Sequence, residues 1–134
     1  MKGPVFLGLD EVVEIHRDQI ERYGGSPAIR DIELLQSAVA MPAAGIGENY
    51  FHTDIHEMAA AYLFHIIRNH PFIDGNKRTG AVAAVVFLYL NGMELDADEE
   101  SFEALVRSVA EGKADKAAAA GFFRKHARKR AGKK

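Results

Sequence analysis

The sequence contains no cysteine, which excludes disulfide bonds and thiolate metal sites and fits a reducing compartment such as the cytoplasm. It also lacks a long apolar segment near its start followed by a small-residue cleavage site, so we expect no secretory signal peptide. The most apolar run, from Ala81 to Leu90, has ten residues, whereas a membrane-spanning helix needs roughly 20. We therefore expect a protein without a membrane anchor, in which this run is a buried helix.

Acidic residues are absent from the last eleven positions, 124–134, which carry seven of the 17 basic side chains. The first 123 residues therefore hold 10 basic against 19 acidic side chains, a net charge of −9. A basic tail can bind nucleic acid or an acidic partner, but chain ends are more often solvated or frayed. With 134 residues in all, we expect a single domain, 1–134, with a disordered tail at 124–134 and no direct binding of nucleic acid.

Helix start and stop signals divide the chain into about six helices. Asp10, Asp31 and Asp54 can cap three of them, and Gly24-Gly25 and Asn91-Gly92 can end two. Residues 43–52 form the longest stretch without a helix signal, and residues 5–7 could form a short extended piece. Because helix 76–90 is apolar on all sides, we expect an all-α bundle with this helix buried at its centre. The expected helices are 10–23, 31–41, 54–69, 76–90, 98–111 and 114–129.

The stretch NHPFIDGNKRTG (69–80) places several kinds of polar chemistry directly before the apolar helix. His70 is its only candidate for a base near neutral pH. Asp74 can bind a divalent cation such as Mg²⁺ through its carboxylate. Gly75 lets backbone amides approach a ligand, and Phe72 is expected to anchor the loop in the core.

Two cations, Lys77 and Arg78, follow in the first turn of the expected helix, where the free N–H groups and the positive end of the helix dipole already favour anions. Each cation placed there costs on the order of 0.3–1 kcal/mol. A bound polyphosphate would turn this repulsion into charge-assisted hydrogen bonds. We therefore expect a site for Mg²⁺ and a nucleotide or polyphosphate with a histidine base beside it. The alternative is a capping loop whose charges are incidental.

Residues 70–78, HPFIDGNKR, resemble the signature of the Fic/Doc family, H-x-F-x-[D/E]-G-N-x-R. Three further stretches resemble the Doc (death-on-curing) branch of this family. They are residues 15–31, the alanine-rich helix before the motif, and NKRT followed by an apolar helix and Asn-Gly. This resemblance implies a helical bundle that binds ATP with Mg²⁺ and modifies a hydroxyl group of a target protein. The implied roles are general base for His70, metal ligand for Asp74, anchor for Phe72, and phosphate contacts for Arg68, Gly75, Asn76, Lys77 and Arg78.

Two positions depart from the pattern of nucleotidyl-transferring Fic proteins. Those proteins commonly have glycine at the position of Lys77 and a second arginine at the position of Ala81, which would clamp phosphate in a way that alanine cannot. Both departures resemble Doc, whose type member phosphorylates elongation factor Tu. We therefore favour a protein phosphotransferase over an AMP transferase, with a catalytically silent binding module as a third alternative.

No inhibitory [S/T]-x-x-x-E-[G/N] segment of the Fic type is found in the sequence: Thr53 to Glu57 has the spacing but is followed by Met58. If the activity is toxic, as the resemblance to Doc implies, inhibition should come from a cognate antitoxin. Such a partner would dock a disordered segment that folds on the bundle.

Four other histidines and two aromatic residues carry weaker signals. His52 and His56 have a spacing that could bind a metal on a helix, although no HExxH context accompanies them. His16 and His65 are expected to be packed, hydrogen-bonded histidines. Tyr50 and Phe51 could line a rim for the target protein, or they could only cover the core.

Overall fold

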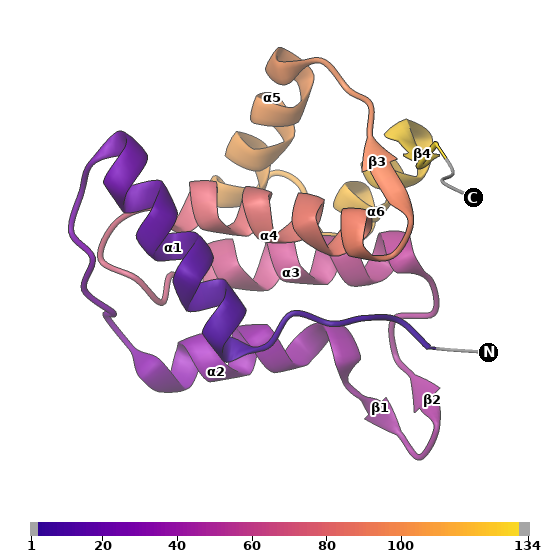
Figure 1. Cartoon of the computed structure of the whole chain (residues 1–134), viewed down its shortest axis with the longest axis horizontal. Coiled ribbons are helices and arrows are strands. Elements are labelled where there is room, and N and C mark those ends of the chain that lie inside the picture. Colours follow the sequence, from indigo (N-terminus) through magenta and orange to yellow (C-terminus); the bar gives the residue numbers. More distant parts are fainter. Residues whose placement is uncertain (1–2, 132–134) are drawn as a thin grey trace.

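The computed structural model describes residues 3–131, and six α-helices dominate them. One 3-10 helix and three short strands lie between these helices, and a fourth strand follows the last of them. Figure 1 shows their arrangement. Within the described part of the chain, no helix is long and apolar enough to cross a membrane. The elements in chain order are α1 (Leu9–Tyr23), α2 (Ile32–Ala40), η1 (Met41–Ala43), β1 (Gly45–Ile46), β2 (Asn49–Tyr50), α3 (Ile55–Asn69), α4 (Asn76–Leu90), β3 (Met93–Leu95), α5 (Glu99–Ala110), α6 (Lys116–His126) and β4 (Ala127–Lys129).

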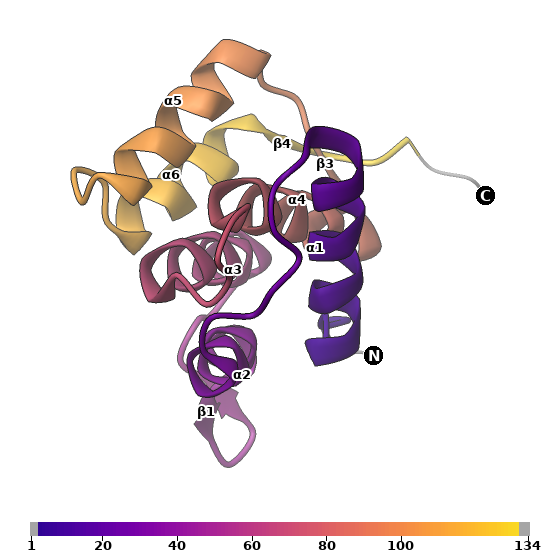
Figure 2. The ribbon, with the colours of Figure 1, turned by 90° about the vertical axis from the view of Figure 1, so that its left-hand side faces the viewer.

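The centre of the bundle is α3, whereas the sequence favoured α4. Helix α3 packs against α2, α4, α5 and α6, and its residues from Met58 to Leu63 are all buried. Helix α4 is partly open to solvent, since Tyr89 and Leu90 near its end are exposed. Figure 2 shows α1 on one side of the α3–α4 pair and α5 with α6 on the other. An all-round apolar composition marked α4 as a core helix, but it did not reveal which helix has neighbours on every side.

Helices α3 and α4 run side by side in opposite directions, because only residues 70–75 connect them. Gly80 of α4 lets the two backbones come close, because it is buried against α3 and has no side chain. A methyl group at Gly80 would lie 3.2 Å from the carbonyl oxygen of Leu63. The close approach fixes both ends of the loop that joins the two helices.

Aspartate side chains begin four of the helices, as helix capping predicts. Asp31 accepts a hydrogen bond from Leu34 N at 3.0 Å, and Asp54 accepts one from Glu57 N at 2.8 Å. Asp98 and Asp115 cap α5 and α6 in the same way. Helix α1 differs from the expectation, since it begins at Leu9 and its cap is Gly8, whose N–H donates to Glu11 Oε1.

Two short antiparallel strand pairs, β1–β2 and β3–β4, were not expected from the sequence. Strands β1 and β2 pair within the stretch expected to be irregular. Strand β3 pairs with β4, which occupies residues 127–129 at the end of an expected helix. This last helix, α6, stops at His126 because the chain there turns to bond with β3, a distant partner that helix signals do not report.

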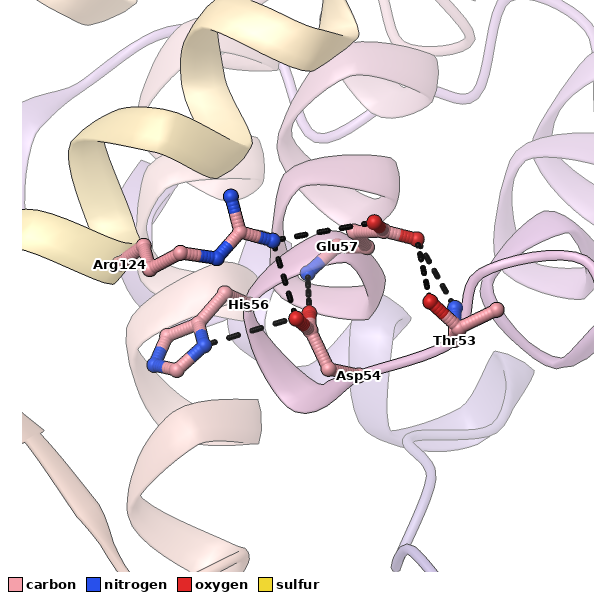
Figure 3. Close-up of polar contacts among 5 residues, drawn as sticks. All are labelled: Thr53, Asp54, His56, Glu57 and Arg124. Carbon is pink, nitrogen blue, oxygen red and sulfur yellow. Dashed lines mark hydrogen bonds and ion pairs between the residues drawn. The ribbon is translucent and has the colours of Figure 1, made fainter.

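The basic tail is tied to the bundle over most of its length. Arg124, in α6, lies 2.9 Å from the Asp54 carboxylate and 3.7 Å from that of Glu57 at the start of α3 (Figure 3). Arg128 pairs with Asp96 at 2.7 Å. In the structure, residues 124–126 of the tail belong to α6 and residues 127–129 form β4, and residues 132–134 lie outside the described part of the chain.

The N-terminal segment before α1 is held by one buried tyrosine. The Tyr62 hydroxyl accepts a hydrogen bond from Leu7 N at 2.7 Å and donates one to Leu7 O at 2.9 Å. Burial of this hydroxyl raises the pKa of Tyr62 to about 12. Residues 5–7, expected to be extended, form no strand, and their polar groups bond to side chains of α3 and to Asn91.

Replacing Tyr62 with phenylalanine should lower the free energy of unfolding by about 1–3 kcal/mol, because it leaves the buried N–H and carbonyl of Leu7 without partners. Urea denaturation of the purified variant measures this change. The matched control is Tyr89→Phe, which removes an exposed hydroxyl and should leave the stability unchanged. Equal stability of Y62F and wild type would contradict this account of the N-terminal segment.

Candidate active site

The loop between α3 and α4 starts with an unusual backbone conformation at His70. Helix α3 ends at Asn69, and His70 has φ 51° and ψ 54°, in the left-handed region. Among the described residues no other non-glycine residue has a positive φ. The conformation turns the chain sharply out of α3 and leaves the His70 side chain exposed at the mouth of a cleft.

This cleft has a volume of about 520 Å³ and lies at the N-terminus of α4. It brings together most of the residues that the sequence singled out, and the end of α5 contributes one wall through Ala110. The lining residues are Ile67, His70, Ile73, Asp74, Gly75, Asn76, Lys77, Arg78 and Ala110.

Phe72 anchors the loop, as expected, and His16 of α1 holds it from the other side. Phe72 is fully buried, and the His16 ring stacks on it with ring centroids 3.7 Å apart. His16 Nε2 lies 2.8 Å from the carbonyl oxygen of Asp74. Because a carbonyl can only accept, Nε2 carries the hydrogen. Burial lowers the pKa of His16, and the positive charge of Arg78 lowers it further, so the neutral ring is favoured.

The Asn76 side chain shapes the loop from inside. Its Oδ1 accepts a hydrogen bond from Phe72 N at 3.0 Å, and its Nδ2 donates one to Phe72 O at 2.9 Å. Both hydrogen bonds are buried, and they direct the amide side chain into the loop. The backbone N–H groups of Asn76, Lys77 and Arg78 find no acceptor among the described residues, as is general for the first turn of a helix. Any phosphate contact at Asn76 would therefore come from its backbone.

The residue before α4 is a glycine that lies close to α1. Gly75 has φ 81°, a conformation that L side chains rarely adopt. A methyl group there would also lie 3.3 Å from Ile20 and 3.5 Å from the His16 ring. Glycine thus allows both the left-handed conformation before α4 and the close approach of this backbone to α1.

Only one oxygen of the Asp74 carboxylate accepts a hydrogen bond from the described residues. Its Oδ2 accepts a hydrogen bond from Ser26 N at 2.8 Å, and no other described group bonds to its second oxygen. The described residues contain no cluster of three or more His, Cys, Asp or Glu side chains that could hold a metal by themselves. One carboxylate with a free oxygen fits Mg²⁺, which is commonly held by one or two carboxylates together with phosphates of a substrate.

Lys77 and Arg78 differ in how firmly they are held. Lys77 is exposed at the cleft and has no carboxylate within ion-pair distance among the described residues. Arg78 donates to Gly24 O at 3.1 Å and more weakly to Gln19 O at 3.4 Å, and it lies over the Tyr23 ring. The guanidinium thereby ties the end of α1 to the start of α4 while it still lines the cleft.

Arg68 is not among the residues that line the cleft. Its guanidinium donates to Ala110 O at 3.1 Å and to Val109 O at 3.4 Å, so it binds the carbonyl end of α5. In this structure Arg68 fixes α5 against the end of α3, which accounts for it without a ligand.

The weaker candidates lie elsewhere. Tyr50 belongs to β2 and packs edge-on against Phe6. The β1–β2 hairpin precedes the start of α3. A 15-residue helix is about 22 Å long, so the hairpin and Phe51 lie far from the loop at the end of α3 (Figure 1). His56 Nδ1 lies 4.0 Å from the Asp54 carboxylate (Figure 3), and His52 is buried. Neither pair matches its suggested role as target rim or metal site.

His65 is a packed histidine, as expected. Its Nε2 lies 2.9 Å from Lys116 Nζ, which donates to the unprotonated nitrogen. Burial first, and the charge of Lys116 second, lower the pKa of His65 to about 4. This pair joins α3 to α6 away from the cleft.

Three residues hold the loop from a distance: His16, Ser26 and Arg30. The sequence predicted that His16 is packed and hydrogen-bonded, which is confirmed, but it did not indicate that any of the three contacts the loop. Arg30 donates to His70 O at 2.6 Å and to Asn69 O at 3.0 Å. All three lie between residues 16 and 30, a segment that the resemblance included as a block. No local pattern there indicates contact with a loop some 40 to 58 residues away.

Comparison with known proteins agrees with this geometry: the chain belongs to the Fic/DOC family, whose family model matches residues 6–88. The chain is similar to the protein named "Toxin Doc" of Mycolicibacterium smegmatis (strain ATCC 700084 / mc(2)155), with 41% identity over 90 residues, 66% of this chain and 69% of the relative. It is also similar to the "Protein kinase doc" of Escherichia phage P1, with 34% identity over 86 residues, 64% of this chain and 68% of the relative. The matched region contains α1 to α3, the loop and most of α4.

The lowered pKa of His16 predicts a pH-dependent stability. The unfolded chain, where histidine titrates near 6.5, binds more protons than the folded state between the two pKa values. The stabilisation is therefore fully present above this pH and is lost as the pH falls, with a slope of at most about 1.4 kcal/mol per pH unit for one site.

The variant His16→Gln keeps an N–H donor for Asp74 O but cannot titrate. Its free energy of unfolding should change less than that of wild type between about pH 7.5 and about pH 5.5, the range around an unperturbed histidine pKa. Urea denaturation at several pH values measures the difference. Identical pH dependence in the two proteins would contradict the account of His16.

Proposed function

We propose that this protein transfers a phosphate from ATP to a hydroxyl group of a target protein, and that it acts as the toxin of a toxin–antitoxin pair. The observation that carries the proposal is the cleft at the start of α4, where free backbone amides and the cations Lys77 and Arg78 converge beside His70. A cationic helix start costs free energy unless an anion binds there. The relatives named as a toxin and as a protein kinase support the same reading.

The chemistry proposed for the cleft needs three groups of residues. His70 takes the proton from the acceptor hydroxyl while its oxygen attacks the γ-phosphorus, the bond to the β-phosphate breaks and ADP leaves. The backbone amides after Gly75, together with Lys77 and Arg78, hold the phosphates. Asp74 would hold Mg²⁺, which supplies positive charge to the phosphate oxygens when bound.

Phosphate transfer is favoured over AMP transfer by the residues at two positions of α4. Lys77 places a flexible cation at the mouth of the cleft, and Ala81 lies one turn further along the helix. Glycine at position 77 and a second arginine at position 81 would suit a clamp on the inner phosphates, and this chain has neither residue. AMP transfer remains the second candidate because the same His70 could activate the same hydroxyl.

Two protein partners follow from this proposal. One is the target that carries the hydroxyl, for which the resemblance to Doc suggests a translation factor such as elongation factor Tu. The other is a cognate antitoxin, since the sequence contains no inhibitory segment of the Fic type. Arg68 is left out of the proposed phosphate contacts, because its guanidinium is bound to the end of α5.

Separate labelling of the phosphates of ATP tests the reaction. With Mg²⁺, purified elongation factor Tu or a cell lysate, and ATP labelled at the γ-phosphate, wild-type protein should label a protein acceptor. ATP labelled at the α-phosphate should leave no label, since ADP departs. His70→Ala should lower transfer by about 10²–10⁴-fold, the usual contribution of a general base.

The control for this experiment is His56→Ala, a histidine outside the cleft, which should keep wild-type transfer. Label from the α-phosphate would establish AMP transfer instead. Absence of label from both positions would reject both enzymatic proposals and leave the binding module.

Lys77 should matter to transfer because it has no other partner. Lys77→Ala should lower γ-phosphate transfer by about 10- to 100-fold, the equivalent of one hydrogen bond to a charged group. The exposed Lys125 of α6 provides the control, and Lys125→Ala should transfer at the wild-type rate. A double variant, Lys77→Gly with Ala81→Arg, should shift labelling toward the α-phosphate; unchanged γ-transfer in it would contradict the role given to these positions.

A further inference from the structure

We propose that Arg30 is a positioning residue for His70: it holds the backbone at the end of α3 in the conformation that keeps the imidazole at the cleft. The inference rests on the proposed function, in which His70 is the general base. Arg30 itself is exposed in the connection between α1 and α2 and does not line the cleft.

The conformation that Arg30 would maintain is unfavourable by itself. His70 has φ 51° and ψ 54°, and in this left-handed region a side chain crowds its own carbonyl group. Residues held in such conformations persist only where surrounding contacts determine them, and they are frequent at active sites. A contact that stabilises the backbone of His70 therefore acts directly on the placement of its side chain.

Arg30 makes this contact through two donors. Its Nε donates to the carbonyl of His70 at 2.6 Å, and one terminal nitrogen donates to the carbonyl of Asn69 at 3.0 Å. Carbonyls at the end of a helix have no partner within the helix. The planar guanidinium can bridge two neighbouring carbonyls at once, whereas a lysine ammonium has no such fork.

The backbone around Arg30 runs beside the same loop and would survive loss of the side chain. Both Arg30 N and Asp31 N donate to Pro71 O, at 2.7 Å and 3.0 Å, and Ile73 N donates to Ala28 O at 3.1 Å. The Asn69 side chain donates to Leu34 O at 2.9 Å. Truncating Arg30 should therefore leave the fold intact and release only the carbonyls of Asn69 and His70.

Kinetics of the Arg30→Ala variant test the inference. The variant should bind ATP with a KM within about two-fold of wild type, because the phosphate-binding residues are untouched, but its kcat should fall by about 10- to 100-fold as the base is misplaced. Arg30→Lys should recover only part of kcat. The control is Arg17→Ala, which removes an exposed arginine paired only with Glu14 and should match wild type.

A second measurement needs neither nucleotide nor acceptor. The Cα and Cβ chemical shifts of His70 report its backbone conformation, and they should leave the left-handed pattern in Arg30→Ala but not in Arg17→Ala. Unchanged shifts in Arg30→Ala would overturn the inference, as would changed shifts with an unchanged kcat. If the wild-type protein transfers no label, the proposed function fails, and the shifts alone still decide whether Arg30 holds His70.

Discussion

The close packing of α3 against α4 is the constraint on which the rest of the structure depends. Gly80 faces Leu63 and Ile67 across the interface, and a methyl group at Gly80 would lie 3.2 Å from the carbonyl of Leu63. With the two helices held this close and in opposite directions, the six residues between them have little freedom in their path. The end of α3 thereby presents His70, the proposed base, beside the free backbone amides at the start of α4, in one cleft.

Within the loop, side chains stabilise the conformation, and backbone N–H groups stay available to a ligand. The Asn76 side chain and the Phe72 ring use their contacts to build the loop, and His16 supports it through stacking and one hydrogen bond. The backbone amides at the start of α4 are left without partners, which is the condition for binding an anion. Some side chains of the signature 70–78, such as Phe72 and Asn76, thus stabilise the loop that presents the backbone N–H donors.

The two cations at the start of α4, Lys77 and Arg78, also differ in whether the fold uses them. Arg78 satisfies part of its guanidinium with carbonyls at the end of α1, so it can stay beside the helix start without a ligand. Lys77 has no such contact among the described residues and stands exposed. Of the two cations, Lys77 therefore contributes less to the fold, and it is also the one on which the proposed preference for phosphate transfer chiefly rests.

Local signals in the sequence predicted the local features well. The caps Asp31 and Asp54 gave the starts of α2 and α3 to within one residue, whereas Asp10 does not cap α1. The loop 70–75 was recognised from its composition and from the family resemblance. Features that depend on distant partners could not be predicted. Strand β4 exists because residues 93–95 lie beside it, and α3 is central because four helices surround it. The contact of Arg30 with His70 could not be predicted for the same reason, since the two residues meet only in the folded chain.

A crystal structure with Mg²⁺ and a non-hydrolysable ATP analogue would test the central claim most directly. The account predicts phosphates on the backbone amides at the start of α4, with Lys77 and Arg78 in contact and the γ-phosphate nearest to His70. An α-phosphate nearest to His70 would contradict phosphate transfer, and an analogue bound away from the start of α4 would contradict the site itself.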